Sequence, residues 1–142
     1  MLVSATVRLA GPQDLAWCAG VEDRDVLPDL VKRKLDYGEI LVAELRGMRV
    51  GYLRLEYLWS KLPYISLIRV NEEVRGRGIG TKMLGFLESM LREKGHEFLM
   101  SSSQTDEPRA QSWHRENGFA ECGIIAGVNR GGIGEVFFRK RI

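Results

Sequence analysis

Apolar residues recur along the chain with two different periods, and these periods predict its secondary structure. Short apolar runs rich in β-branched residues predict strands, and apolar positions three and four residues apart predict amphipathic helices. The resulting order, β-α-α-β-β-β-α-β-α-β-β, is typical of an α/β domain with a mixed sheet of about seven strands and about four helices. The predicted strands are residues 6–10, 40–45, 50–58, 63–70, 98–102, 119–127 and 134–139, and the predicted helices are 13–21, 26–37, 79–94 and 107–116.

The third predicted helix connects two strands that should lie parallel in the sheet. Helix 79–94 follows strand 63–70 and precedes strand 98–102, and this crossover is long enough for a right-handed βαβ unit. Residues 46–49 and 128–133 contain glycine between strand-like runs, which is typical of hairpin loops. The two strands joined by each of these loops are therefore expected to pair as hairpins.

A glycine-rich segment, Arg75-Gly76-Arg77-Gly78-Ile79-Gly80, lies between the fourth strand and the third helix. The first N–H groups of a helix have no intrahelical partner and carry the positive end of the helix dipole. Glycines let an anion approach these groups closely, and the two arginines add permanent positive charge beside them. The segment therefore predicts a phosphate or pyrophosphate site, although such a turn could also be a solvated loop.

Two common phosphate motifs do not fit this segment. In a dinucleotide fingerprint starting at Gly76 the third glycine would fall at Thr81, and in a P-loop the order of Thr81 and Lys82 would be reversed. The remaining pattern, Arg75-x-x-Gly78-x-Gly80, resembles the [RQ]-x-x-G-x-[GA] element of the GNAT family of N-acetyltransferases. In that family this element wraps the pyrophosphate of acetyl-coenzyme A.

A second element supports the resemblance. The segment Ala110–Phe119 is similar to the family's A-x-x-[FW]-Y-x-x-x-G-F element, and the predicted element order is also that of the family. The likeness spans nearly the whole chain, so we expect a single GNAT domain over residues 1–142. The resemblance implies a sheet that is splayed between strands 4 and 5.

The resemblance also implies how acetyl-coenzyme A would bind as cosubstrate. Its pantetheine arm would pair with the backbone of the fourth strand, as an added strand does at a sheet edge. A backbone N–H near Leu67 or Ile68 would stabilise the oxyanion that develops at the thioester. The residues expected to bind the cosubstrate are Ile68, Arg69, Val70, Arg75, Gly76, Arg77, Gly78, Ile79, Gly80, Thr81, Gln104 and Ser112.

Direct attack by an amine in a ternary complex requires proton transfers. An alkylammonium acceptor, with a pKa of about 10.4, must lose a proton first. Glu56 is the first candidate for the base, with Glu39 and Glu72 behind it. For the departing thiolate the family often uses a tyrosine, and His114 takes its place here. His114 is either the proton donor or a partly exposed helix residue.

The acceptor site is predicted less sharply. Four acidic residues around the join of the first two helices could attract a cationic amine or form a solvated turn: Glu22, Asp23, Asp25 and Asp29. Residues 129–134 could shape another wall. An aromatic lip between strands three and four could grip a substrate or be covered in a homodimer. The lip consists of Tyr57, Trp59, Leu62 and Tyr64.

Composition narrows the functional class. The net charge of +2 results from 21 basic and 19 acidic residues, which disfavours a nucleic-acid binder, although an RNA-binding module built on Arg75–Gly78 remains a competing hypothesis. Cys18 and Cys122 have no metal-ligand spacing, so we expect no metal, and they lie outside the motifs, so we expect no thioacyl-enzyme. With no signal peptide and no spanning segment, a cytoplasmic enzyme is expected. The other competing hypothesis is a non-catalytic acyl-coenzyme A sensor of the same fold.

Overall fold

The computed structural model describes residues 4–142, and these contain four α-helices and seven strands in the predicted order. Residues 1–3 of the predicted domain lie outside the described part. Backbone contacts divide the chain into two units. Unit 1 holds the chain up to Leu55 together with Leu67–Ser89, and unit 2 holds Glu56–Ser66 and Met90–Ile142. That the whole chain forms a single domain stays a prediction.

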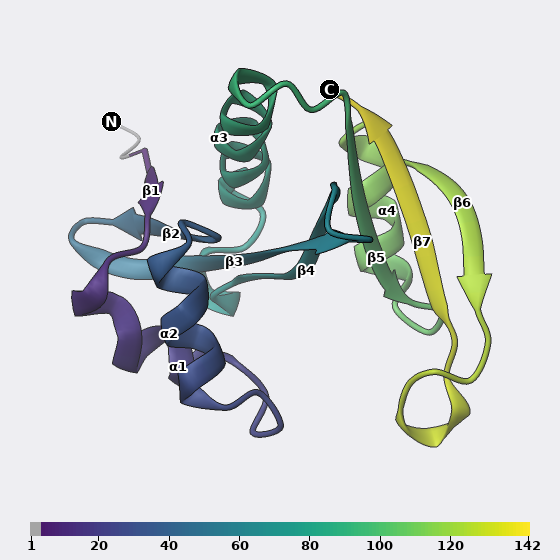
Figure 1. Cartoon of the computed structure of the whole chain (residues 1–142), viewed down its shortest axis with the longest axis horizontal. Helices are drawn as coiled ribbons and strands as arrows, with labels where there is room; N and C mark the ends of the chain where they lie inside the picture. Colours follow the sequence, from purple (N-terminus) through teal and green to yellow (C-terminus); the bar gives the residue numbers. More distant parts are fainter. Residues whose placement is uncertain (1–3) are drawn as a thin grey trace. The chain divides into compact units, whose positions relative to one another are not determined.

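The elements have boundaries close to the predicted ones (Figure 1). Three short 3-10 helices, which the sequence did not predict, lie among the described residues at Pro12–Asp14, Glu72–Val74 and Arg130–Gly132. The strands are β1 Thr6–Leu9, β2 Ile40–Leu45, β3 Met48–Leu58, β4 Leu62–Val70, β5 Phe98–Gln104, β6 Ala120–Ile125 and β7 Glu135–Arg141. The α-helices are α1 Leu15–Val21, α2 Pro28–Asp36, α3 Ile79–Glu93 and α4 Pro108–Glu116.

The strands form one mixed sheet with the order β1-β2-β3-β4-β5-β7-β6. Pairing is antiparallel between β1 and β2, β2 and β3, β5 and β7, and β6 and β7. Strand β4 pairs in parallel with β5, with Tyr64 opposite Met100 near the start of both strands. The predicted α/β class and the predicted parallel βαβ connection are thus confirmed.

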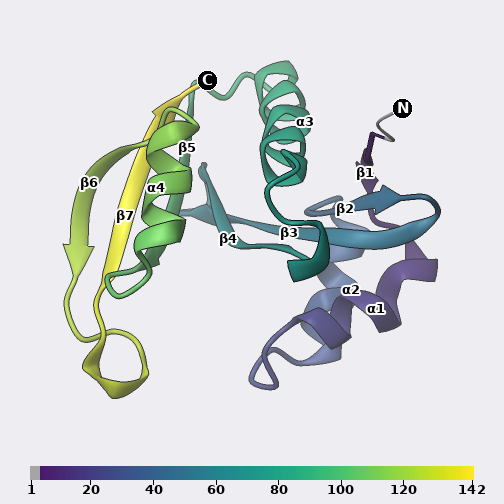
Figure 2. The ribbon, with the colours of Figure 1, turned by 180° about the vertical axis from the view of Figure 1, so that it is seen from behind.

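In unit 1, helices cover both faces of the sheet. Figures 1 and 2 show α1 and α2 on one face of β2 and β3 and α3 on the other. Trp17 of α1 packs edge-on against Tyr52 of β3, with 6.2 Å between ring centroids. On the opposite face, Gly51 of β3 makes room for α3, because a Cβ built on it would lie 2.7 Å from Sδ of Met83. The buried core on the side of α1 and α2 includes Ala10, Cys18, Val31, Leu35, Ile40, Val42 and Tyr52.

The connection between β2 and β3 is tighter than the sequence suggested. Leu45 pairs with Met48, so the loop consists of Arg46 and Gly47 alone. Both residues have a positive φ, 53° and 77°. These angles are typical of a two-residue hairpin turn of the mirror-image type, which matches the twist of the flanking strands.

In unit 2, α4 packs against one face of the strands β5 and β7 (Figure 2). Residues alternate along these strands, so Val136 and Phe138 of β7 are buried towards the helix. Strand β6 forms the outer edge of the sheet, and all six of its residues are exposed. The other face of β5 and β7 carries polar residues described below.

Candidate functional site

The glycine turn begins immediately after a short 3-10 helix at the end of β4. Gly76 and Gly78 each have φ of +78°, a left-handed conformation that other residues adopt only with strain. A Cβ added at either position would meet nothing within 4 Å. Backbone conformation therefore explains these two glycines, and the space over the turn is open to a ligand.

Arg75 is held at the entrance to this turn. Its Nε donates a hydrogen bond of 2.9 Å to the carbonyl oxygen of Val70, and its Nη1 lies 3.7 Å from the carboxylate of Glu72. The backbone N–H of Asn71 donates to the carbonyl oxygen of Val50 on β3 at 2.8 Å. The contact with Val70 connects Arg75 to the end of β4, and the contact with Val50 connects the next residue, Asn71, to β3. About half of the Arg75 side chain stays exposed.

Helix α3 starts directly at the turn, as the periodicity predicted. Ile79 is buried and fixes the first helical residue, and the N–H of Lys82 donates to the carbonyl oxygen of Gly78 at 3.0 Å. The preceding N–H groups lie at the helix start, where an anion can accept from them. Arg77 is exposed beside them. The turn thus provides open space above its two glycines, a helix N-terminus and positive charge, which together fit a pyrophosphate.

The other expected cosubstrate residues fall into both units. Ile68, Arg69 and Val70 belong to the part of β4 in unit 1, together with the glycine turn. Gln104 and Ser112 belong to unit 2, at the end of β5 and on α4. The carbonyl oxygen of Gln104 accepts a hydrogen bond of 3.2 Å from Nε2 of Gln111, and Ser112 is exposed.

His114 is buried in unit 2, with 2% of its surface exposed. Its Nδ1 lies 2.7 Å from the carbonyl oxygen of Ala110, which can only accept, so Nδ1 carries the proton. Its Nε2 lies 2.7 Å from Oγ of Ser101, and in the neutral ring this nitrogen accepts from the hydroxyl. Burial lowers the pKa of His114. The description of His114 as a partly exposed helix residue is therefore wrong, and its role as a proton donor stays a prediction.

The three carboxylates considered as bases have different surroundings. Glu39 accepts a hydrogen bond of 3.0 Å from the ammonium group of Lys34, a buried residue that also donates to the carbonyl oxygen of Leu55. Glu72 is 86% exposed beside Arg75. Glu56 is half-buried near the end of β3 in unit 2. Glu56 as the base stays a prediction.

The expectation for the acidic cluster is wrong for Glu22. This carboxylate is buried, and its Oε2 accepts from the hydroxyl of Tyr52 at 2.5 Å and from Nε of Arg54 at 2.6 Å. Burial and the neighbouring carboxylate raise the pKa of Tyr52 far above its usual value. Asp23, Asp25 and Asp29 are exposed. Glu22 therefore joins α1 to β3 within unit 1 and is neither a solvated charge nor an attractor of cations.

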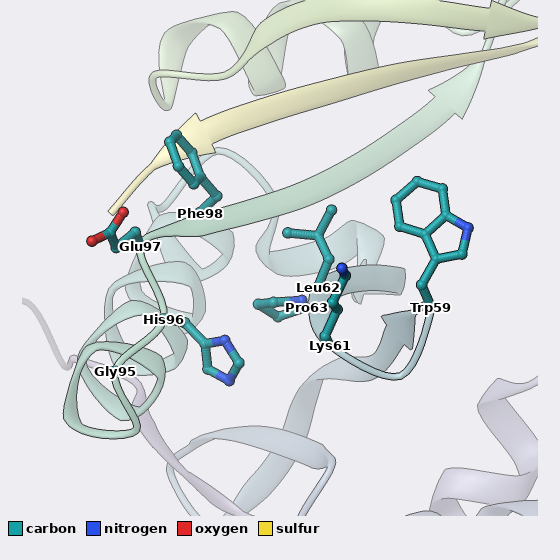
Figure 3. A pocket seen from close by; sticks show the side chains of 8 residues that line it. All are labelled: Trp59, Lys61, Leu62, Pro63, Gly95, His96, Glu97 and Phe98. Atoms are coloured by element: carbon teal, nitrogen blue, oxygen red, sulfur yellow. The ribbon is translucent and has the colours of Figure 1, made fainter.

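The residues of the aromatic lip, all in unit 2, have different neighbours. Trp59 and Leu62 line a hollow of about 310 Å³ at the start of β4 and β5, together with Pro63 and Phe98 (Figure 3). Trp59 is 78% exposed and has φ of 53°, in the tight turn between β3 and β4. The ring of Tyr57 lies 5.8 Å from that of His96, and the ring of Tyr64 stacks on that of Phe137 at 5.8 Å. Since His96 also lines the hollow, Tyr57 adjoins Trp59 and Leu62 through this ring, whereas the contacts of Tyr64 are with Phe137 and Ser102.

One polar group of unit 2 was missed in the sequence. Oγ of Ser102 donates a hydrogen bond of 2.6 Å to Oε2 of Glu135, and the hydroxyl of Tyr64 lies 2.6 Å from the same Oγ. Nδ2 of Asn129 donates to Oε1 of Glu135 at 2.9 Å. The available signal was that Glu135 is the only acidic residue in the last strand. Its two hydrogen-bond partners come from β5 and from the loop before β7, and Tyr64 of β4 is connected to it through Ser102.

Comparison with known proteins identifies one family. The model of the acetyltransferase (GNAT) family matches residues 10–119. No curated protein sequence matches the chain at a significant level. The matched residues include both the glycine turn and the second element at Ala110–Phe119.

Solved structures share the fold at low sequence identity. A GNAT-family acetyltransferase from Bacillus cereus ATCC 10987 has a TM-score of 0.81 and 22% identity, with 97% of each chain covered. The ribosomal-protein-alanine N-acetyltransferase of Brucella melitensis has a TM-score of 0.80 and 24% identity, over 96% of this chain and 99% of that one. An acetyltransferase from Bacillus anthracis strain Ames, solved with acetyl-coenzyme A, has a TM-score of 0.67 and 21% identity. That match covers 72% of this chain and 61% of the Bacillus anthracis protein.

Proposed function

The chain belongs to the acetyltransferase (GNAT) family, and we propose that it transfers an acetyl group from acetyl-coenzyme A to an amine. The observation that carries this proposal is the glycine turn at the start of α3. Gly76 and Gly78 are left-handed, with open space where a side chain would stand, and a hydrogen bond to the carbonyl oxygen of Val70 holds Arg75 beside them. A pyrophosphate is the anion that the family binds with this element, and the Bacillus anthracis relative was solved with acetyl-coenzyme A.

Most of the residues proposed to bind the donor belong to unit 1. The pyrophosphate would accept from the backbone N–H groups of Gly76–Thr81, and Arg77 would screen its charge. The pantetheine amides would pair with the backbone of Ile68, Arg69 and Val70. Gln104 and Ser112 are proposed to contact the arm or the adenosine phosphate.

Acetyl-coenzyme A supplies an activated acetyl group, so the chain needs no nucleophile of its own. Cys18 is buried, and burial raises the pKa of its thiol to about 11, which keeps it protonated and unreactive. Cys122 lies on the exposed strand β6, outside both motif elements. Direct attack of the amine on the thioester is therefore the proposed route.

The proposal includes two proton transfers, one from the amine to a base and one from a donor to the thiolate. Glu56 is the base that the sequence predicts, and His114 is the predicted proton donor to the thiolate. For His114 the test is a His114→Phe variant compared with His114→Tyr, which restores the tyrosine usual in the family. Unchanged turnover at saturating substrates in His114→Phe, with an unaltered pH profile, would remove His114 from the mechanism. A loss that His114→Tyr repairs would support it.

The acceptor is proposed to be a small-molecule amine, a protein N-terminus or a lysine side chain. Acetylation of a ribosomal protein is what the name of the Brucella melitensis relative describes, and it gives one member of the panel below. A cytoplasmic location and a homodimer that covers Trp59 are also proposed. Within residues 4–142, the structure contains no helix that is long and apolar enough to span a membrane.

The test is release of the coenzyme A thiol from acetyl-coenzyme A with a panel of alkylamines, polyamines and peptides. Release that requires an amine, with acetylated amine detected by mass spectrometry, supports the proposal. Tight binding of acetyl-coenzyme A without release for any acceptor would favour the acyl-coenzyme A sensor instead. Binding of RNA that persists in excess coenzyme A and falls steeply with salt would favour the RNA-binding module.

A further inference from the structure

The face of β5 and β7 opposite α4 carries a connected row of side chains, all within unit 2. Ser101 of β5 bonds to His114 of α4, and Phe138 of β7 stacks on the same histidine. Side chains alternate along a strand, so Ser102 and Glu135 lie on the opposite face. Ser102 is paired with Phe137 in the register of the two strands, and Tyr64 of β4 reaches Ser102 from the other side.

The hydrogen bonds in this row have a defined direction. The hydroxyl of Ser102 has one proton, which it donates to Oε2 of Glu135. In the contact between Tyr64 and Ser102 the tyrosine must therefore donate and the serine accept. Asn129 donates to Oε1 of the same carboxylate. The row thus leads from Tyr64 through Ser102 to Glu135, and the carboxylate at its end is oriented from both sides.

The carboxylate of Glu135 accepts hydrogen bonds from two neutral side chains of the described residues. Both donors to its carboxylate are neutral groups, a hydroxyl and an amide, and no salt bridge to it is found within residues 4–142. A carboxylate has about four acceptor positions, and these donors take two of them. Tyr64, Ser102, Glu135 and Phe137 are each partly exposed. A half-buried negative charge that solvent can reach attracts a cation.

Two aromatic rings stand beside this carboxylate. Tyr64 and Phe137 are stacked, with 25° between their planes and 5.8 Å between centroids. Phe137 is two residues from Glu135 on the same strand face. Aromatic faces attract ammonium groups, and a carboxylate next to them accepts the ammonium protons. The combination favours a primary ammonium over a neutral or anionic group.

We infer that this row binds the ammonium group of the acyl acceptor and that Glu135 takes its proton. The inference rests on the proposed acetyl transfer, and it assigns to Glu135 the role that the sequence gave to Glu56. In the step, the N–H bond of the ammonium breaks, and the proton passes to Glu135 directly or through Tyr64 and Ser102. The neutral amine then attacks the carbonyl carbon and forms the C–N bond, and the C–S bond breaks with its electron pair on the departing thiolate. The second proton, which the nitrogen loses as the amide forms, is taken up by this thiolate or by water.

The test compares acceptors that do and do not need a base. At about pH 7.5 an alkylamine is almost fully protonated, because its pKa is about 10.4, whereas an aromatic amine is neutral. For Glu135→Gln we expect kcat/KM with alkylamines to fall by about 100-fold, the lower end of the usual contribution of a general base. With an aromatic amine the same variant should retain activity within about threefold, since no proton has to be removed before attack.

Matched variants separate this role from a structural one. Glu121→Gln makes the same chemical change on the exposed neighbouring strand β6 and should leave both acceptors unaffected. The affinity of Glu135→Gln for acetyl-coenzyme A should equal that of the wild type, which shows that the fold and the donor site are intact. Glu56→Gln, assayed in parallel, compares the base that the sequence predicts with Glu135 as the base, since only one of the two variants should show a loss confined to alkylamines.

The outcomes distinguish the inference from the proposed function. Equal losses of Glu135→Gln with both classes of amine, or no loss with either, would overturn the role of Glu135 while leaving acetyl transfer in place. A loss confined to alkylamines in Glu56→Gln instead would also overturn it. Absence of thiol release by the wild type with every amine would overturn the proposed function and this inference together.

Discussion

The imidazole of His114 lies parallel to the ring of Phe138, with 4.5 Å between centroids and 4° between planes. The contact joins α4 to β7 at the centre of unit 2, and the hydrogen bond from Ser101 adds β5. Phe119 and Trp113 meet the same imidazole edge-on. The histidine is therefore an integral part of the packing between the helix and the sheet, whatever its role in proton transfer.

This packing predicts that stability depends on pH through His114. Burial lowers the pKa of His114, so between the ordinary pKa of about 6.5 and the lower folded value the unfolded state binds more protons. The free energy of unfolding should fall as the pH falls through this window, by at most about 1.4 kcal/mol per pH unit. Urea unfolding measured from about pH 7.5 to 5.5 should show this slope in the wild type and not in His114→Phe.

Two controls fix the interpretation of that slope. Above about pH 7.5 the imidazole is neutral in both states, so both proteins should show no slope from this residue. The lower limit of about pH 5.5 also avoids the titration of Asp14. The hydrogen bond from Arg8 holds the pKa of this carboxyl well below its usual value, so its contribution to stability is lost only in stronger acid. An equal slope in the wild type and in His114→Phe would contradict the assignment.

The buried carboxylate of Glu22 should contribute strongly to stability. Replacement by alanine removes the acceptor of Tyr52 and of Nε of Arg54 in the interior of unit 1. Removing one partner of a buried ion pair typically costs about 3 kcal/mol or more. Chemical denaturation of Glu22→Ala should show this loss, whereas the adjacent exposed Asp23→Ala should stay within about 0.5 kcal/mol of the wild type. Similar values for the two variants would show that Glu22 is not buried as described.

Two glycines of unit 1 predict opposite effects of the same substitution. A Cβ at Gly51 would lie 2.7 Å from Sδ of Met83 and 2.9 Å from Cβ of Ala43, so Gly51→Ala should cost about 1–3 kcal/mol through overpacking. Gly85 lies within α3 and has nothing within 4 Å of an added Cβ, so Gly85→Ala should stabilise the protein by about 1 kcal/mol. Urea denaturation of both variants checks the sign of each effect. A stabilising Gly51→Ala would contradict the close packing of α3 on β3.

The sequence predicted the elements well, because periodicity is a local property. The apolar run Ile65–Val70 has the pattern of a strand, and the apolar positions from Ile79 onward have the period of a helix. The structure has a strand and a helix at these places, with the glycine turn between them. Glu22 could not be interpreted in the same way. The residues that follow it, Asp23 to Asp25, are exposed, and its burial depends on Tyr52 and Arg54, about thirty residues away on β3.

The row that we propose to bind the acceptor could not be predicted either, because its residues are also distant in sequence. Glu135 occupies an outward position of a strand, which by itself indicates a solvated charge. Its significance comes from Ser102, Tyr64 and Asn129, which β5, β4 and a loop bring to it. For His114 the helical position was predicted, but the stack on Phe138 depends on strand register, which the sequence does not specify.

The account depends most on the glycine turn as the binding site of acetyl-coenzyme A, and calorimetric titration with this ligand tests it directly. Gly78→Ala places a Cβ in the open space over the turn and strains the left-handed backbone at φ of +78°. We predict that its dissociation constant rises at least about tenfold over the wild type, or about 1.4 kcal/mol. Gly85 lies on α3 more than one helical turn beyond the glycine turn, so Gly85→Ala should bind acetyl-coenzyme A as the wild type does. Equal affinity of all three proteins, or no binding by the wild type, would contradict the account.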